Sequence, residues 1–308
     1  MIYGLTCQKD CEPFMDDLKQ RKPMQKMSYM QVLQARNGSI EGHSPNLGRW
    51  TPRAIRTLFS VVVLMTSFSA LAAGKDEDVA ERTDAAENSS QIAQVITRPY
   101  KAEYNLSRRG RNHGTAGREL SRLENGSWRY ETFSRASLLL LSDRRFNDTV
   151  FQLAETRVEP LSFEYERRGT GSNRHYKVTF DREQQKLLPA NGDPVTVEWQ
   201  DDLLDPNAVL HQLQIDVALG QETFFTYPLV DDDGSLSIYE FEIDKREVIV
   251  LGDQRIETIR VSRVREHDRR QTYFWFAPEW NYTLVRMQQI EGGREAAMLS
   301  LTSLEFFE

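Results

Sequence analysis

Cysteine is almost absent from this sequence. Only two of the 308 residues are cysteines, Cys7 and Cys11. Their C-x-x-x-C spacing lacks the second pair of ligands that a structural zinc site requires. The chain beyond residue 11 therefore forms no disulfide and offers no thiolate as a nucleophile or as a site for lipid attachment.

Long hydrophobic runs are also missing. The most apolar segment spans residues 58–71, about 14 residues, and hydroxyl side chains interrupt it, whereas a membrane-spanning helix needs roughly 20 apolar residues. Arg53 and Arg56 precede this segment, and the small-x-small pattern Ala70-Leu71-Ala72 ends it. These features indicate a cleavable signal peptide over residues 53–72 rather than a transmembrane anchor. We therefore expect export to the periplasm of a Gram-negative cell, with no membrane span left after cleavage.

The segments on either side of the signal peptide lack the composition of a fold. Residues 1–52 have no sustained apolar period and are predicted to be non-globular. A signal peptide normally begins near its own start codon, so either translation starts downstream, at Met27 or Met30, or residues 1–52 are a cytoplasmic head. Residues 73–98 are charged and rich in small side chains, which predicts a flexible linker, with a short amphipathic helix as the alternative.

Motifs for catalysis and metal binding are lacking too. Four histidines remain beyond residue 72: His113, His175, His211 and His267. None has the H-x-x-H or H-x-E spacing of a metal site, and we expect His211 to be a surface or boundary residue. The aspartates of residues 201–205 and 231–233 are more typical of a helix cap and a hairpin loop than of a calcium site. The sequence therefore predicts no enzyme, no metal and no cofactor.

Acidic residues outnumber basic residues beyond the signal peptide. Residues 1–72 contain 9 of the 39 Lys and Arg and 5 of the 46 Asp and Glu, so the remainder carries a formal charge of −11. An acidic surface of this size disfavours nucleic acids and anionic membranes as partners. The remaining arginines include four spots at predicted strand ends: Arg108, Arg109 and Arg111; Arg144 and Arg145; Arg167 and Arg168; Arg269 and Arg270. These spots either line one rim and meet phosphate or carboxylate head groups, or are solvated hairpin ends.

The sequence does contain the alternating pattern that is typical of β-strands. Apolar and polar residues alternate over five segments: 100–107, 161–166, 176–181, 195–200 and 239–244. Turn dipeptides such as Asn-Gly, Asp-Gly and Gly-Gly separate such segments every 10 to 20 residues. Residues 99–308 are therefore predicted to form a single mostly-β domain, an antiparallel meander of about 12 to 14 strands. A meander of this length curls into an open or closed barrel.

Two segments are distinctive within this pattern. Residues 206–219 are predicted to form one embedded helix, because Asp205 can cap it, Pro206 fits its first turn and Gly220 ends it. The second segment, residues 271–293, holds two strands around Pro278. Tyr273 and Trp275 are predicted to face one way and the two intervening phenylalanines the other, so that a layer must cover each face.

The order of these segments resembles a bacterial exported-protein family, domain of unknown function 3108. The resemblance rests on YKAEYNL, WRYET, VEPLSFEYERRG, KVTFDREQQKL and DDLLDPNAVLHQL, and on TYFWFAPEWNYTLVRMQQIEGGREAAMLSL near the end. The family's W-x-A is kept at Trp275, but its Leu-Pro-Val-Arg is replaced by Thr-Leu-Val-Arg, which ends at Arg286. The resemblance implies the fold and assigns no catalytic residue. More remotely, it is similar to periplasmic half-barrels that carry lipoproteins or lipids.

Aromatic side chains from at least six predicted strands must either fill the barrel or line an open interior. The sequence favours a binding module that holds an apolar ligand, a lipid or an acyl chain, in the concave sheet. The alternative is an interaction protein of the cell envelope with a filled core and no small ligand, whose partner is another envelope protein. The candidate lid or cavity residues are Leu138, Leu139, Leu140, Leu141, Leu210, Leu213, Tyr273 and Trp275.

We expect a Gram-negative host to remove the N-terminus at about Ala73 and to release the protein into the periplasmic fraction. N-terminal sequencing of the recovered protein checks this outcome. Deletion of residues 1–26 should leave export unchanged if translation starts downstream. An intact N-terminus in the membrane pellet would instead identify residues 58–71 as an anchor.

Overall fold

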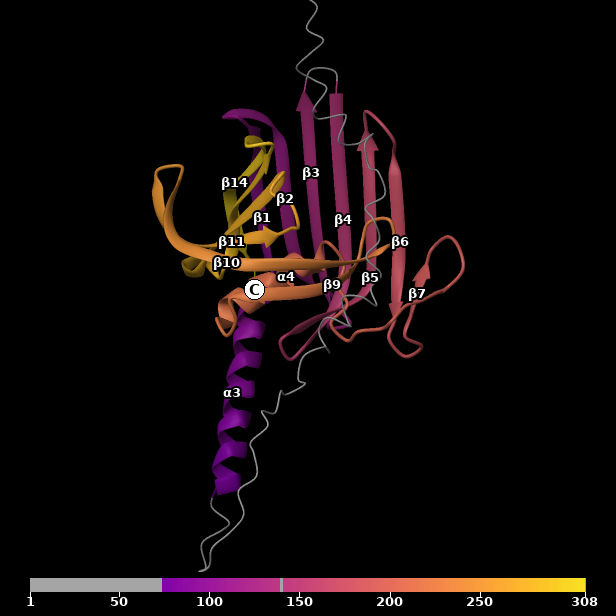
Figure 1. Cartoon of the computed structure of the whole chain (residues 1–308), viewed down its shortest axis with the longest axis vertical. Helices are drawn as coiled ribbons and strands as arrows, with labels where there is room; N and C mark the ends of the chain where they lie inside the picture. Colours follow the sequence, from indigo (N-terminus) through magenta and orange to yellow (C-terminus); the bar gives the residue numbers. More distant parts are fainter. Residues whose placement is uncertain (1–73, 139–140, 308) are drawn as a thin grey trace, which may run out of the picture. The chain divides into compact units, whose positions relative to one another are not determined.

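The fold is a single antiparallel sheet that curls around one helix (Figure 1). The computed structural model describes residues 74–138 and 141–307. Its strands are β1 (Tyr100–Arg108), β2 (Arg111–Arg122), β3 (Trp128–Leu138), β4 (Leu141–Ala154), β5 (Arg157–Gly169), β6 (Arg174–Asp181), β7 (Lys186–Pro189), β8 (Val195–Thr196), β9 (Phe224–Val230), β10 (Leu236–Leu251), β11 (Gln254–Val264), β12 (Arg270–Ala277), β13 (Thr283–Glu291) and β14 (Arg294–Phe306). Its helices are α3 (Gly74–Ile96), α4 (Ala208–Leu219) and the short 3-10 helix η1 (Pro278–Trp280). The predicted mostly-β meander with an embedded helix is confirmed.

The strand order divides the sheet into two halves. It runs β8-β7-β6-β5-β4-β3-β2-β1-β14-β13-β12-β11-β10-β9, so the first and last strands pair in the middle and β8 and β9 are the edges. The chain crosses from one edge to the other through residues 197–223, which contain α4. Leu204 in this crossover bonds to β9, donating its N–H to the Pro228 carbonyl and accepting the N–H of Val230, each at 2.9 Å. The barrel is therefore open, and the crossover spans its edges.

Side-chain packing brings the two halves together. Long antiparallel sheets twist and curl, and in Figure 1 β9 to β11 cross the direction of β3 to β6. The main core surrounds α4, which contacts both β5 and β9. In a second core, Val230 and Leu236 of the β9–β10 hairpin pack with Phe163 and Phe180 of β5 and β6. The alternation predicted for the first strand is confirmed, because Tyr100, Ala102 and Tyr104 are buried and the residues between them are exposed.

Helix α4 begins two residues later than predicted, but Asp205 caps it as expected. Its Oδ1 accepts the backbone N–H groups of Asn207 and Ala208, both at 2.9 Å, and Gly220 ends the helix with φ 65°. Most of the helix is buried, polar residues included. The prediction that His211 lies at the surface is wrong: its side chain is 0% exposed, because both halves of the sheet enclose the helix.

The structure differs from the flexible linker predicted for residues 73–98. Residues 74–96 form helix α3, and Ala93 and Ile96 at its end are buried in the main core. Asn281 fixes this end by donating its side-chain amide to the carbonyls of Val95 and Ile96, each at 3.1 Å. The low average hydrophobicity of the segment concealed the apolar residues of its last turns, which share one helical face.

Strand β12 has the two apolar faces that the sequence predicted, but they are covered differently. The face toward α4 packs ring on ring, with the centroids of Phe274 and Phe241 5.8 Å apart. On the other face, Trp275 donates its indole N–H to Glu247 Oε1 at 2.9 Å. Its ring lies between the guanidinium groups of Arg260 and Arg286, each 5.9 Å away. Arginine side chains of neighbouring strands thus cover part of this face.

This difference predicts unequal costs of truncation. Phe276→Ala should lower the free energy of unfolding by an amount near the upper end of about 3–5 kcal/mol, because its rigid surroundings cannot fill the cavity. Trp275→Ala should lower the free energy of unfolding by an amount near the lower end of this range, because the flexible arginine side chains can move into the space left by the ring. Urea unfolding of the two variants measures the difference, with Trp275→Phe as the control that keeps an aromatic ring. Equal losses would contradict the assigned covering of β12.

Candidate functional site

The structure does not gather the predicted ligand residues into one site. Leu139 and Leu140 lie outside the described residues, and Leu138 is described only in its backbone. Of the others, Leu213 is fully buried on α4, whereas Tyr273 and Trp275 lie on the face of β12 that points away from α4. Half-buried Leu141 begins β4, and half-buried Leu210 lies on α4. Strand alternation explains the separation, because neighbouring positions of β12 belong to opposite faces.

The concave face of the sheet is occupied by α4. Asn207, just before the helix, donates its side-chain amide to the Tyr130 carbonyl at 2.7 Å. Thr149 donates its hydroxyl to Asp205 at 2.9 Å, and Gln212 accepts the Val158 N–H at 2.7 Å. These buried polar contacts fix the helix on β3 to β5. The space in which the sequence predicted an apolar ligand therefore holds the protein's own helix.

Three buried side chains on α4 or just before it have shifted pKa values. Burial lowers the pKa of His211 to about 4, and its Nε2 lies 3.0 Å from the Thr97 hydroxyl. Burial raises the pKa of Asp205 to about 7 and that of Asp216 to about 6, although each carboxyl accepts hydrogen bonds. Burial around α4 therefore disfavours the charged forms of all three side chains.

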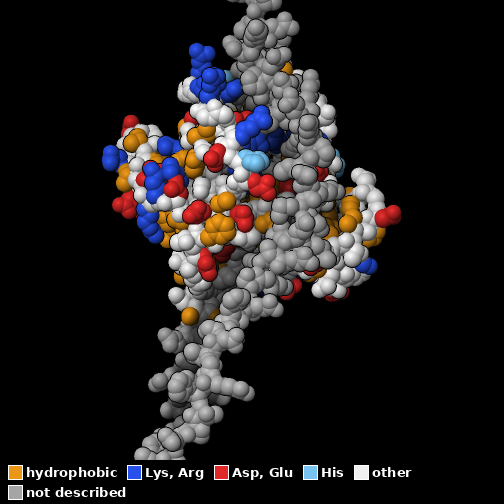
Figure 2. Space-filling model, viewed as in Figure 1, with side chains coloured by type: hydrophobic (Ala, Val, Ile, Leu, Met, Phe, Trp, Pro, Cys, Tyr) orange, Lys and Arg blue, Asp and Glu red, His pale blue; other side chains and the backbone are white. Residues whose placement is uncertain are grey.

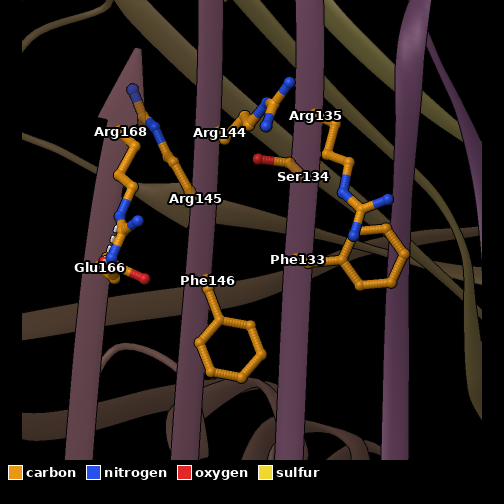
Figure 3. Close-up of a pocket in the computed structure, with 8 residues that line it drawn as sticks. All are labelled: Phe133, Ser134, Arg135, Arg144, Arg145, Phe146, Glu166 and Arg168. Atoms are coloured by element: carbon orange, nitrogen blue, oxygen red, sulfur yellow. Dashed lines mark hydrogen bonds and ion pairs between the residues drawn. The ribbon is translucent and has the colours of Figure 1, made fainter.

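A groove of about 220 Å³ lies on β3 to β5 (Figure 3). Its lining residues are Phe133, Ser134, Arg135, Arg144, Arg145, Phe146, Glu166 and Arg168. Strand alternation assigns all but Ser134 and Arg145 to the outer face, the face opposite α4. Gly117 of β2 pairs with Phe133, and a Cβ at this glycine would overlap the ring. The groove is thus accessible from outside the curled sheet.

Three arginines of the groove form a row across neighbouring strands. Arg144 of β4 pairs directly with Arg135 of β3 and with Arg168 of β5. Like charges at such positions repel each other by roughly 0.2–1 kcal/mol per pair. Arg168 is ion-paired with Glu166, and Arg135 lies 5.0 Å from the centre of the Phe133 ring. The side chain of Arg144 forms no hydrogen bond or ion pair with any residue of 74–138 or 141–307.

A second arginine row lies on the inner face of the same strands. Arg167 of β5 pairs with Arg145 of β4 and with Arg174 of β6. Asp143 binds two of these side chains, at 3.0 Å from Nε of Arg167 and 3.0 Å from Nη2 of Arg145. Arg167 also donates to the Ser172 carbonyl at 3.1 Å and is only 6% exposed. The inner row thus has an acidic partner within the protein.

The ladders place the predicted basic spots at one end of the sheet. The hairpin turns β1–β2, β3–β4, β5–β6 and β11–β12 all fall at that end, and they carry the four spots named from the sequence. Figure 2 shows Lys and Arg side chains in the upper part of the view. Arg135 was missed, because its place beside Arg144 depends on the register of β3 and β4.

A family model described as protein of unknown function (DUF3108) matches residues 100–299. A search of curated proteins finds no match. None of the helices within residues 74–138 and 141–307 is long and apolar enough to cross a membrane.

Three solved structures are similar at low identity. A beta-barrel-like protein of domain of unknown function DUF1849 from Brucella abortus has 11% identity and a TM-score of 0.46, and the match covers 68% of this chain and 98% of that one. The Pseudomonas aeruginosa MucA/MucB complex has 9% identity and a TM-score of 0.30, covering 73% and 58%. LprF from Mycobacterium bovis has 11% identity and a TM-score of 0.25, covering 71% and 93%.

The buried imidazole of His211 predicts a loss of stability in acid. As pH falls from 6.5 to about 4, the imidazole of His211 becomes protonated in the unfolded chain but stays neutral in the folded chain. This difference lowers the free energy of unfolding by about 3 kcal/mol. Asp205 and Asp216 act in the opposite sense, because the folded chain keeps their protons to higher pH. Urea unfolding of wild type and His211→Gln between pH 7 and 4 isolates the histidine. The free energy of unfolding of the variant should rise relative to that of wild type as pH falls. A constant difference between the two proteins across this pH range would contradict the lowered pKa of His211.

Proposed function

The chain belongs to the DUF3108 family of proteins of unknown function, and we propose that it is an exported binding protein of the cell envelope rather than an enzyme. Its binding surface is the arginine groove on the outer face of β3 to β5. The groove contacts phosphate head groups at a membrane surface. Of the two alternatives predicted from the sequence, the protein's own helix in the concave face supports the filled core of the second. The proposed partner is a layer of lipid head groups instead of another envelope protein.

The row of three arginines carries this proposal. Arg144 lies between two other arginines and has no acidic partner among the described residues, so repulsion within the row is only partly relieved. A guanidinium group presents a fork of N–H donors that matches the oxygens of a phosphate. An oxyanion over Arg135 and Arg144 would reduce the repulsion within the row and would accept charge-assisted hydrogen bonds. The two rings of the groove, Phe133 and Phe146, would flank it.

The position of the groove allows contact with an extended membrane surface. It lies on the outer face, where an extended layer of head groups can reach it, whereas α4 occupies the inner face. The negative charge of the whole chain acts weakly at this site, because salt screens charges beyond about 8 Å. A local concentration of arginines therefore dominates the field that an approaching head group meets.

Replacement of the two arginines that lack an acidic partner tests the proposal. Arg135→Gln/Arg144→Gln should bind phosphatidylglycerol vesicles about 30-fold more weakly than wild type, because each arginine contributes about 1 kcal/mol near an anionic surface. Cosedimentation with the vesicles measures binding. The matched control, Arg246→Gln, removes an exposed arginine of β10 outside the groove and should change binding less than about twofold.

Two further arms identify the source of the phosphate. Vesicles of phosphatidylcholine alone should bind weakly, because they have no net charge. Competition by millimolar inorganic phosphate, without any preference for anionic vesicles, would assign the groove to a free oxyanion instead of a membrane. Equal binding of wild type and the double variant to anionic vesicles would contradict the proposal.

A further inference from the structure

Two asparagine–glycine dipeptides lie in hairpin loops of the sheet. Asn125-Gly126 is in the β2–β3 loop and Asn191-Gly192 is in the β7–β8 loop, whereas Asn37-Gly38 lies outside the described residues. Both asparagines and both glycines of the two loops are exposed. The dipeptide and its exposure are therefore alike in the two loops, and the local hydrogen bonds distinguish them.

Such a dipeptide contains both reactants of an intramolecular substitution. Once the N–H of the glycine has lost its proton, its nitrogen can attack Cγ of the asparagine side chain. Glycine favours this attack, because it has no Cβ beside the nitrogen and adopts backbone conformations that other residues avoid. The N–Cγ bond forms, the Cγ–Nδ2 bond breaks, and the side-chain nitrogen leaves as ammonia. Water then opens the succinimide ring at either carbonyl, so the products are an aspartate or isoaspartate residue and ammonia.

Hydrogen bonds constrain both reacting groups in the β2–β3 loop. Gly126 donates its backbone N–H to the Leu123 carbonyl at 2.9 Å, so the nitrogen that would attack is engaged. Oδ1 of Asn125 accepts the N–H and the hydroxyl of Ser127, at 3.1 and 2.6 Å, which fixes the side-chain amide in an Asx turn. Ring closure at Asn125 therefore requires these hydrogen bonds to break first.

Neither reacting group is constrained in this way in the β7–β8 loop. The side chain of Asn191 and the backbone N–H of Gly192 form no hydrogen bond with any residue of 74–138 or 141–307. Gly192 has a φ of 110°, and a Cβ placed on it would have no atom within 4 Å, so there is open space beside its nitrogen. Strands β7 and β8 pair through two residue pairs, so little structure restrains the loop between them.

We propose that Asn191 is a site of spontaneous deamidation in the folded protein and that its loop protects Asn125. The reaction adds one negative charge at residue 191, close to Asp193. In the isoaspartate product it also adds one methylene carbon to the main chain between β7 and β8. Strand β8 is a sheet edge of two exposed residues, so the fold accommodates this change. The site is independent of the arginine groove and of the function proposed for that groove.

Peptide mapping by mass spectrometry tests the proposal on the folded wild-type protein, incubated at mildly alkaline pH. The peptide with Asn191 should acquire the mass of an acid in place of an amide, and in water labelled with heavy oxygen it should take up one labelled atom. Asn125 should react at least about tenfold more slowly, because its hydrogen bonds must break first. No reaction at Asn191, or equal rates at the two asparagines, would overturn the proposal.

Unfolding and substitution separate the local structure from the dipeptide itself. In concentrated urea the two asparagines should react at similar rates, because both loops have lost their hydrogen bonds. In the folded protein, Ser127→Ala should speed the reaction at Asn125, because it removes one donor to Oδ1. The matched control Asn191→Gln should remove the mass change, because its longer side chain closes a larger ring. If the ratio of the two rates were the same in urea as in the folded protein, the protection of Asn125 by its loop would be refuted.

Discussion

The buried polar contacts that fix α4 on β3 to β5 are the constraint on which the rest of the structure depends. The two edges of the sheet, β8 and β9, are joined through the crossover that contains this helix. Asp205 ties the start of the helix to Thr149, and Asn207 ties it to the backbone of β3. These groups are buried, so each lost partner would leave an unsatisfied polar atom. The helix thereby sets the curl of the sheet, and the curl decides which residues of every strand face inward.

This division of faces gives the arginines of one region three different environments. The outer row of Arg135, Arg144 and Arg168 is exposed and only partly neutralised. The inner row is bridged by Asp143, which makes it a structural element of the rim. Arg118 of β2 is buried among tyrosines, where a positive charge is most costly. Net charge therefore conceals local concentrations of cations on the surface and in the interior of an acidic chain.

The sequence predicted what depends on short-range pattern. Alternation identified parts of β1, β5, β6 and β10, whereas the segment 195–200 forms a strand only at Val195–Thr196, where both residues are exposed. Asp205 and Gly220 placed the ends of α4 within two residues. Features that depend on pairing between distant segments could not be predicted from the sequence. The burial of His211 follows from two half-sheets closing around one helix, and the row beside Arg144 follows from the register of three strands. Alternation alone placed Arg118 on an apolar face, so that signal was present in the sequence and was missed.

The pairing of the first and last strands has a consequence for how the chain acquires its structure. Tyr100 of β1 pairs with Phe306 of β14, so the central ladder of the sheet joins residues near the two limits of the domain. Hairpins such as β3–β4 and β12–β13 close short loops, whereas the β1–β14 ladder must close a loop of nearly the whole domain. Such a high contact order slows folding and delays the central pairing until β14 is available. Until then β1 has one open edge, whose unpaired N–H and C=O groups can pair with a strand of another chain.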